Sequence, residues 1–408
     1  MTEVPSAQRW ARRVTFVIAG VLYGMVAIWI LEDPATNLQT DWTSFDNAAD
    51  RLFEGEAVYQ RWDPVDEPLP FLYPPFVLIL TLPLRLFGFF ASWGYSAVFT
   101  GATYAAGLAL ALRSTPGPSV DRRTAFLIAL GSGSMFGAGL IGQYSGMYVL
   151  AFGLAIWCWH NDRRFLAGLA LSILIMKPNI AIAVPFVLIW SRSWRQLQGF
   201  VVGSAAALLL SLPFGLHQWS EFVANVQDMG SRQLTGQNPD DKMVTIVGNF
   251  ITWTGGSAAS FSALAVWAST AAILGLAVLA VWTRPQLEAS PQRAFAIFAI
   301  FVVVANPRMW FYDAILIAMA TTMLWVDRES LGGLARRVIT PASVILWVLS
   351  WGGAFSELNR FVGVAGAALL LVVVADSVKQ AKQRTENSGD VIAILPSEAS
   401  SDPGVAAA

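Results

Sequence analysis

Carboxylates are concentrated in one polar stretch of the chain, residues 40–75 (TDWTSFDNAADRLFEGEAVYQRWDPVDEPLPFLYPP). Its acidic side chains are Asp41, Asp46, Asp50, Glu54, Glu56, Asp63, Asp66 and Glu67. A carboxylate within hydrogen-bonding distance of a hydroxyl can take its proton as a general base. The same residues also fit a solvated acidic helix, in which Asp46 and Asp50 share a face and Asp41 caps the N-terminus. Spacing alone leaves both interpretations open for each acid.

Two cations interrupt apolar sequence and could bind an anion. Lys177 lies in LSILIMKPNIAIAV, and Arg308 lies in VVVANPRMWFYD. A charged side chain at membrane depth is costly unless it has a partner, so each predicts a nearby phosphate or carboxylate. The alternative is that the side chain extends to the membrane interface, since Pro178 is expected to end the helix beside Lys177.

A third break in apolar sequence is the run Gly142-Gln143-Tyr144-Ser145-Gly146. The Gln143 amide could hydrogen-bond a sugar hydroxyl or a phosphate oxygen. A plain turn between two helices also explains the two glycines.

The elements that hold these residues are predicted to be membrane helices. The 408-residue chain is 55% apolar and 13% charged, against about 25% charged in soluble proteins. The single cysteine, Cys158, excludes a disulfide within the chain, and two histidines are too few for a histidine-based metal site. The net charge of −1 argues against a nucleic-acid partner.

Arginine and lysine positions predict the topology, because these residues collect in short cytoplasmic loops. If residues 76–90 form a re-entrant or interfacial helix rather than a crossing, most of the 26 basic residues fall on the side of the N-terminus. They are Arg9, Arg12, Arg13, Arg113, Arg122, Arg123, Arg163, Arg164, Arg192, Arg195, Arg284, Arg293, Arg328, Arg336, Arg337, Lys379, Lys382 and Arg384. A full crossing would place most of them outside.

The fold class predicted is therefore an all-α integral membrane protein of about twelve transmembrane helices, with both termini cytoplasmic. The expected spans are 14–31, 93–112, 124–141, 144–159, 165–176, 179–190, 197–213, 259–282, 294–305, 312–326, 338–354 and 361–376. The first is too long for a signal-peptide core, so it is expected to stay uncleaved.

The predicted division is a cytoplasmic N-terminus over 1–13, a membrane domain over 14–378 and a disordered cytoplasmic tail over 379–408. External loops are expected at 32–92 and 214–258, the second with an amphipathic segment around 219–229.

With this topology the polar features fall on one face of the membrane, the external one. The donor-anion candidates are Lys177 and Arg308, and the substrate-binding candidates are Tyr73, Gln143, Tyr144, Asn179, Asn306, Tyr312 and Asp313. Lys177 and Arg308 fall on the external side in this topology, so they are among the basic residues that do not favour it. Their position beside the other motifs is therefore reasonably independent support for a single active face.

The ordered motifs resemble glycosyltransferase family 87, integral-membrane enzymes of the GT-C class. They are the string D-x-x-x-F-x-x-A-A-x-x-L-x-x-G-x-x-x-Y over 41–59, Tyr73-Pro74-Pro75, Pro83-Leu84, Gly142-Gln143, Lys177-Pro178 and Asn306-Pro307. The resemblance covers most of 14–330. Within this family, the chain is similar to the polyprenyl-phosphate-mannose-dependent mannosyltransferases of mycobacterial phosphatidylinositol mannoside synthesis.

The resemblance implies a GT-C bundle, a polyprenyl-phosphate-linked sugar donor, and a glycolipid or glycan acceptor. It implies Asp41 as the catalytic base and a re-entrant helix after the tyrosine-proline-proline motif. Asp46 is kept as a second candidate. The expected reaction moves mannose with inversion, at the membrane lipid surface, without a cofactor or a metal.

Two alternatives stay open. Tyr312 and Asp313 stand where the mannosyltransferases have a histidine, so an arabinofuranosyltransferase of the same class fits as well. A polyprenyl-lipid transporter or flippase is the alternative from another class. Transporters place polar groups near the bilayer midplane, whereas here the span centres are nearly free of charge.

Overall fold

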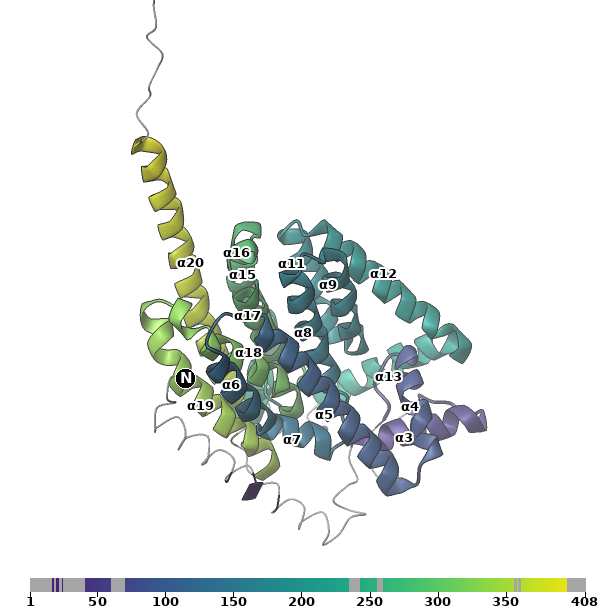
Figure 1. Ribbon diagram of the computed structural model, residues 1–408. Coiled ribbons are helices and arrows are strands. Elements are labelled where there is room, and N and C mark those ends of the chain that lie inside the picture. The colour runs from purple at the N-terminus through teal and green to yellow at the C-terminus, as the bar shows by residue number, and fades with distance from the viewer. Residues whose placement is uncertain are drawn as a thin grey trace, which may run out of the picture.

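The computed structural model describes residues 41–59, 70–234, 243–254, 260–355 and 361–394, with the single residues 17, 20, 21, 24 and 358. Within these ranges the regular elements are helices, and strand pairing is limited to one isolated antiparallel bridge between Met243 and Trp310 (Figure 1). The expected N-terminus 1–13, the expected span 14–31, and residues 32–40, 60–69, 235–242 and 255–258 of the external loops lie outside the described residues, apart from those single positions.

The helices follow one another along the chain with short connections. The first half contains α3 (Asp41–Glu54), η1 (Pro75–Val77), α4 (Leu78–Thr81), η2 (Leu82–Leu86), α5 (Phe89–Arg113), α6 (Ser119–Leu130), α7 (Gly133–Leu140), α8 (Gly146–His160), α9 (Arg164–Leu171), η3 (Ser172–Met176), α10 (Pro178–Ala181), α11 (Ala183–Trp190) and α12 (Trp194–Leu210). The second half contains η4 (Leu212–Phe214), α13 (His217–Leu234), α14 (Ile246–Trp253), α15 (Ser260–Val281), α16 (Arg284–Ala289), α17 (Pro291–Val304), η5 (Phe311–Ala314), α18 (Ile315–Val326), η6 (Arg328–Ser330), α19 (Gly333–Phe355) and α20 (Val362–Ile394).

Five helices are long and apolar enough to cross a membrane, within the residues searched. They cover Ala91–Arg113, Trp194–Phe214, Ser262–Val281, Gly333–Gly352 and Val362–Glu386. Shorter apolar helices cover Pro75–Leu86, Gly146–His160, Arg164–Met176, Pro178–Trp190, Pro291–Val304 and Phe311–Val326. The chain is therefore an all-helical protein with the character of a multispan membrane protein.

The structure differs from the expected spans at 124–141, where two helices stand in place of one. The first helix ends at Leu130, with Gly131 as its C-cap. Ser132 caps the second, because its hydroxyl accepts the Met135 N–H at 3.3 Å. Gly133 lies against the backbone of Ser350 in α19, so closely that a Cβ would overlap it. This close contact fixes the bend between α6 and α7.

The segment after the acidic stretch is a short, broken helix. Its three pieces, η1, α4 and η2, cover Pro75–Leu86, and Pro83 lies within the last. Proline removes a backbone donor and favours the tighter 3₁₀ turns seen on either side of α4. Twelve residues at about 1.5–2 Å each fall short of the roughly 30 Å hydrocarbon core.

Glycines let the helices of the bundle approach closely. A Cβ on Gly153 of α8 would overlap the carbonyl of Gly107 in α5, and one on Gly168 of α9 would overlap the carbonyl of Gln196 in α12. Small residues at such crossings are typical of membrane helix packing. At the centre, α17 is buried on nearly every face, as expected of an apolar helix without a polar side.

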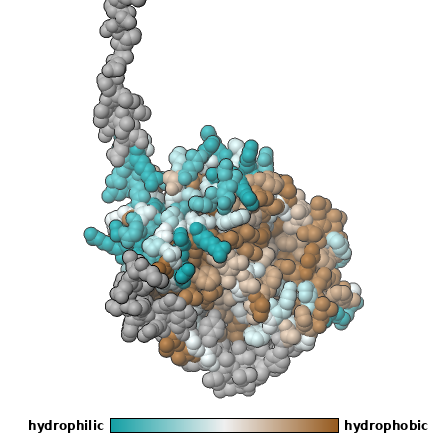
Figure 2. Space-filling view, viewed as in Figure 1, coloured by the Kyte–Doolittle hydropathy of each residue, from teal (hydrophilic) through white to brown (hydrophobic). Residues whose placement is uncertain are grey.

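Hydrophilic residues gather at the end of the bundle where α9 and α12 begin (Figures 1 and 2). In sequence, Arg163 and Arg164 stand at the start of α9, and Arg192 and Arg195 at the start of α12. Ion pairs there join Arg293 to Asp327 at 3.5 Å and Arg328 to Asp121 at 2.8 Å. The acidic helix α3, with α4 and α13, lies at the other end (Figure 1). The bundle therefore separates the expected cytoplasmic loops from the expected external ones.

Helix α20 extends past the apolar end of the chain. Disorder was predicted from residue 379, but α20 continues to Ile394. Gln380 donates to Asp376 at 2.9 Å and to the Ser330 carbonyl at 3.1 Å, and Lys382 pairs with Glu386 one turn later at 3.8 Å. These local pairs extend the helix past its apolar part. Residues 395–408 lie outside the described residues.

Candidate active site

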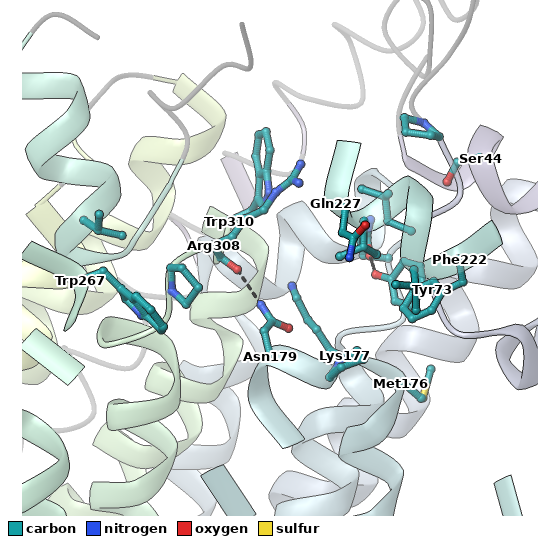
Figure 3. A pocket seen from close by; sticks show the side chains of 18 of the residues that line it. Ser44, Tyr73, Met176, Lys177, Asn179, Phe222, Gln227, Trp267, Arg308 and Trp310 are labelled. Atoms are coloured by element: carbon teal, nitrogen blue, oxygen red, sulfur yellow. Dashed lines mark hydrogen bonds between the residues drawn. The ribbon is translucent and has the colours of Figure 1, made fainter. Parts of the chain in front are cut away.

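A cavity of about 570 Å³ lies where α3, α13, α14 and α15 meet the two proline motifs at 177–179 and 306–308 (Figure 3). Its polar lining consists of Ser44, Tyr73, Gln143, Lys177, Asn179, Gln227, Arg308, Trp310 and Tyr312. Its apolar lining includes Phe222, Val223, Val226, Val247, Ile251, Ala263, Leu264 and Trp267. The cavity is thus two-sided, with hydrogen-bonding groups and cations facing an aliphatic and aromatic wall.

Lys177 extends into the cavity between the Arg308 side and the Tyr73 side (Figure 3). It sits between η3 and α10, where Pro178 begins the next helix. Its ammonium forms an ion pair with Asp313, 136 residues away in sequence. The Lys177 side chain is 15% exposed and that of Asp313 is fully buried. A carboxylate of the protein itself is therefore one partner of Lys177.

The two proline motifs are joined by their asparagines. Asn179 donates to the Asn306 amide oxygen at 2.8 Å and to the Arg308 carbonyl at 3.0 Å. Asn306 donates in return to the Asn179 carbonyl at 3.0 Å. These bonds satisfy the polar groups that the two helix breaks release, and they fix the strand-like turn that carries Arg308.

Aromatic rings connect the two cations of the cavity. The Lys177 ammonium lies 5.5 Å from the centre of the Tyr312 ring. Tyr312 is parallel to Trp310 at 6.4 Å, and the Arg308 guanidinium lies 5.9 Å from the Trp310 ring. Each cation is within the range at which a ring face attracts it. The rings hold both cations close to the cavity lining.

Tyr73 and Gln143 meet on the opposite wall, where the Tyr73 hydroxyl donates to the Gln143 amide oxygen. Tyr59 donates to the Tyr73 carbonyl at 2.6 Å and Thr100 donates to the Gln143 carbonyl, so both residues are held by neighbours. They come from the tyrosine-proline-proline motif and the glycine-rich turn that the sequence singled out.

The glycine-rich turn also holds the start of α3. Gly142 has a φ of +69°, and a Cβ there would overlap Trp42. The Trp42 N–H donates to the Ile141 carbonyl at 2.9 Å. Helix α3 begins at Asp41, whose side chain lies outside the described residues, and Ser44 one turn later lines the cavity.

Four predicted site residues do not line the cavity: Asp46, Tyr144, Asn306 and Asp313. Tyr144 is buried and donates to the Leu80 carbonyl at 3.2 Å, which ties α4 to the glycine-rich turn. Asn306 and Asp313 brace residues that do line the cavity. The remaining described candidates, Tyr73, Gln143, Lys177, Asn179, Arg308 and Tyr312, all line it.

Asp46 faces the start of α5, where its carboxylate accepts the Ser92 hydroxyl at 3.1 Å. Burial raises the pKa of Asp46, the Ser92 hydrogen bond lowers it, and the nearby Asp50 raises it further. Asp46 is therefore separated from the cavity lining, although it shares a helix with Asp41.

The comparison with known families agrees with these motifs. The sequence profile of glycosyltransferase family 87 matches residues 71–307, more than half of the 408-residue chain. The chain belongs to glycosyltransferase family 87. Among solved structures it is similar to ArnT from Cupriavidus metallidurans bound to undecaprenyl phosphate, at 13% identity and a TM-score of 0.44, with 96% of this chain and 82% of that chain covered. No protein of curated function matches the chain.

The family 87 match begins just before Tyr73 and ends at Pro307. It contains the glycine-rich turn and the Lys177-Pro178-Asn179 motif, but neither Asp41 nor the run from Arg308 to Asp313. The matched part therefore supplies most of the cavity. The α3 helix and η5 also contribute to the cavity lining, and both lie in sequence outside the match.

Some lining residues of this family 87 member were not predicted, notably Ser44, Phe222, Gln227, Trp267 and Trp310. Phe222 and Gln227 lie in the segment 219–229 that was expected to be amphipathic, and four lining positions there follow helical spacing. Trp310 lies two residues after Arg308. Nothing in the neighbouring sequence identifies Trp267 as a cavity residue, because it stands in an apolar helix like many other tryptophans.

Among the described residues, no group of three or more His, Cys, Asp or Glu side chains could hold a metal ion. The expectation of a metal-free and cofactor-free site remains a prediction, since Asp41 and the acids over 60–69 are outside that set.

Proposed function

We propose that this glycosyltransferase moves mannose from a polyprenyl-phosphate donor to a lipid or glycan acceptor at the external face of the membrane. The observation that carries the proposal is the two-sided cavity. Lys177 and Arg308 lie on its polar side, and α13, α14 and α15 form its apolar side. A phosphate joined to an isoprenoid chain has the same division into an anionic and an apolar part.

The apolar wall leads toward lipid. Leu264 lines the cavity, is 52% exposed, and belongs to α15, one of the five candidate spans. Val223 and Val226 of α13 are also exposed. An isoprenoid chain could leave the cavity past these side chains and stay in the bilayer, while its phosphate remains beside the cations.

Asp41 is the proposed base. Ser44 lines the cavity, and residues three apart share one face of a helix, which supports Asp41 at the cavity rim. The acceptor hydroxyl oxygen attacks the anomeric carbon as its proton passes to Asp41. The bond from that carbon to the phosphate oxygen breaks, and the polyprenyl phosphate leaves with the electron pair.

Positive charge stabilises the phosphate as it departs. Arg308 provides it at one side of the cavity and Lys177 at its floor. A single base on the face opposite the leaving group gives inversion, and the positive charge on the sugar resembles that in glycoside hydrolysis. No cofactor or metal takes part in this scheme.

The proposed topology is a GT-C bundle of twelve spans with both termini cytoplasmic. The segment Pro75–Leu86 is re-entrant or interfacial, which its short and broken helix supports. The domain limits 1–13, 14–378 and 379–408 and the external loops 32–92 and 214–258 belong to this proposal, with α20 extending into the last segment.

Arabinose is the second candidate sugar, because Tyr312 and Asp313 occupy the position where the mannosyltransferases have a histidine. Membership of a glycosyltransferase family favours transfer over lipid transport. The apolar span centres support the same choice.

The test is to incubate detergent-purified protein with polyprenyl-phosphate mannose and polyprenyl-phosphate arabinose, each labelled in the sugar, and with membrane lipid extract as the acceptor source. We expect label from the mannose donor to move to a lipid or glycan product. Transfer from the arabinose donor alone would select the second candidate. Detergent removes the compartments that transport requires, so absence of transfer from both donors would contradict the proposed enzyme.

A further inference from the structure

The buried carboxylate of Asp313 joins both cation-bearing segments of the cavity. One oxygen, Oδ2, accepts the Lys177 ammonium and also the Trp310 N–H at 2.9 Å. Trp310 in turn lies under the Arg308 guanidinium, 5.9 Å from its ring centre. A single carboxylate oxygen therefore holds Lys177 directly and the Arg308 segment through the backbone.

The second oxygen of Asp313 connects a third segment. Oδ1 accepts the Ser145 hydroxyl at 3.4 Å, at the start of α8. Asp313 is fully buried and does not line the cavity, whereas Lys177 does. The carboxylate thus lies behind the lysine and has no surface from which to touch a ligand in the cavity.

The ion pair with Asp313 favours the charged form of Lys177. The groups that face its ammonium include the Asp313 carboxylate and the Tyr312 ring from η5, and the Tyr148 ring from α8 at 5.8 Å. Neither ring carries a negative charge at neutral pH. Burial disfavours a charged lysine, and a neighbouring carboxylate favours it.

We propose that Asp313 is a positioning residue that holds the Lys177 ammonium protonated and aimed at the donor phosphate, and that steadies the Arg308 side through the Trp310 amide. This inference rests on the proposed function and gives a role to a residue that never contacts the substrate. It replaces the direct substrate contact that the sequence predicted for Asp313.

A purely structural ion pair is the competing explanation, because breaking a buried pair destabilises a fold wherever it lies. The matched control is the pair of Arg293 with Asp327, at 3.5 Å and with both side chains almost fully buried. Asp327 follows the last residue of α18, whereas Asp313 precedes its first. The two carboxylates therefore lie at opposite ends of the same helix.

The experiment measures binding of polyprenyl phosphate from pH 7 to pH 10, where its phosphate stays ionised. Asp313→Asn keeps the size and an acceptor for the Trp310 N–H but removes the charge. We expect its affinity to fall about tenfold or more across this range, since Lys177 then loses its proton more easily. The affinity of the wild-type protein for polyprenyl phosphate should change by less than about threefold over the same pH range. Asp327→Asn should lower thermal stability without this pH dependence.

The double variant Lys177→Arg with Asp313→Asn identifies the group that titrates. A guanidinium stays protonated throughout the range, so the added pH dependence should disappear. Binding by Asp313→Asn that parallels the wild type, or the same pH dependence in Asp327→Asn, would overturn the proposal. So would a wild-type protein that does not bind polyprenyl phosphate. Failure of sugar transfer with intact binding would instead contradict only the proposed function.

Discussion

The Trp42 N–H donates to the carbonyl of Ile141 at 2.9 Å, which attaches the first turn of α3 to the glycine-rich turn after α7. These residues are about one hundred positions apart, yet this bond fixes where the acidic helix begins. Asp41, the proposed base, is the residue immediately before Trp42.

The first prediction concerns that base. Asp41→Asn keeps the size of the side chain but cannot accept a proton, so transfer should fall by at least about a hundredfold, the lower range of general-base contributions. Thermal stability should stay near that of the wild type. Asp46→Asn is the matched control on the same helix, and it should retain activity because Asp46 does not line the cavity. Similar losses in both variants would contradict the assignment.

The second prediction concerns Gly142, which combines a φ of +69° with a close approach to Trp42. Gly142→Ala should cost about 1–2 kcal/mol of unfolding free energy from the backbone alone, and more from the overlap. It should also lower transfer, because the start of α3 must move.

Gly139→Ala is the control for that variant. Gly139 lies in α7, and a Cβ there meets nothing within 4 Å. Alanine favours a helix over glycine by roughly 0.5–1 kcal/mol, so this variant should be as stable as the wild type or more so. Equal behaviour of the two variants in melting and transfer assays would refute the role of the turn.

The third prediction concerns Arg308. Arg308→Ala should raise the apparent KM for the donor roughly ten- to a hundredfold, since hydrogen bonds to a charged group contribute about 1.5–3 kcal/mol. Arg284→Ala serves as the control, because Arg284 is an exposed residue of α16 that pairs with Glu288 at 3.0 Å. A donor KM unchanged in Arg308→Ala would argue against phosphate binding at this residue.

The fourth prediction uses the pH dependence of stability at Asp46. Burial raises the pKa of Asp46 above its ordinary value of 3.8 in the folded state. Folding therefore favours the protonated form of Asp46. The stabilisation from this protonated form is fully present below pH 3.8 and is lost as the pH rises through the raised pKa. Asp46→Asn should melt at a higher temperature than the wild type at pH 7.

At pH 3.5 the same comparison should give a smaller difference, because wild-type Asp46 is then largely protonated as well. Thermal melting of both proteins at the two pH values measures this. A difference that stays constant would mean that folding does not shift the pKa of Asp46. A difference that grows toward low pH would mean that folding lowers this pKa, and either result would contradict the prediction.

The fifth prediction concerns the asparagine pair that joins the two proline motifs. Asn179→Ala and Asn306→Ala should each destabilise the protein by about 1–2 kcal/mol, with a coupling of similar size in the double variant. The coupling arises because the 2.8 Å bond between the two amides is lost in either single variant. Additive losses would mean that the two asparagines act independently.

Local sequence was sufficient for several conclusions. Apolar length and arginine position predicted most helices, because burial in lipid demands long apolar helices and positive loops collect on one side. The proline motifs predicted where helices break. Lys177 and Arg308 stood out because a charged group is costly in apolar surroundings unless it has a partner. Tyr73 and Gln143 stood out through the tyrosine-proline-proline motif and the glycine-rich break.

The identity of each partner depended on the three-dimensional arrangement. Lys177 meets Asp313 across 136 residues, and Asp313 therefore lies behind the cavity although its sequence position suggested a substrate contact. The close approach of Gly133 to the backbone of α19, next to the break between α6 and α7, also joins distant segments. Contacts between distant segments depend on how helices pack, and a side chain's neighbours along the chain carry no record of that packing.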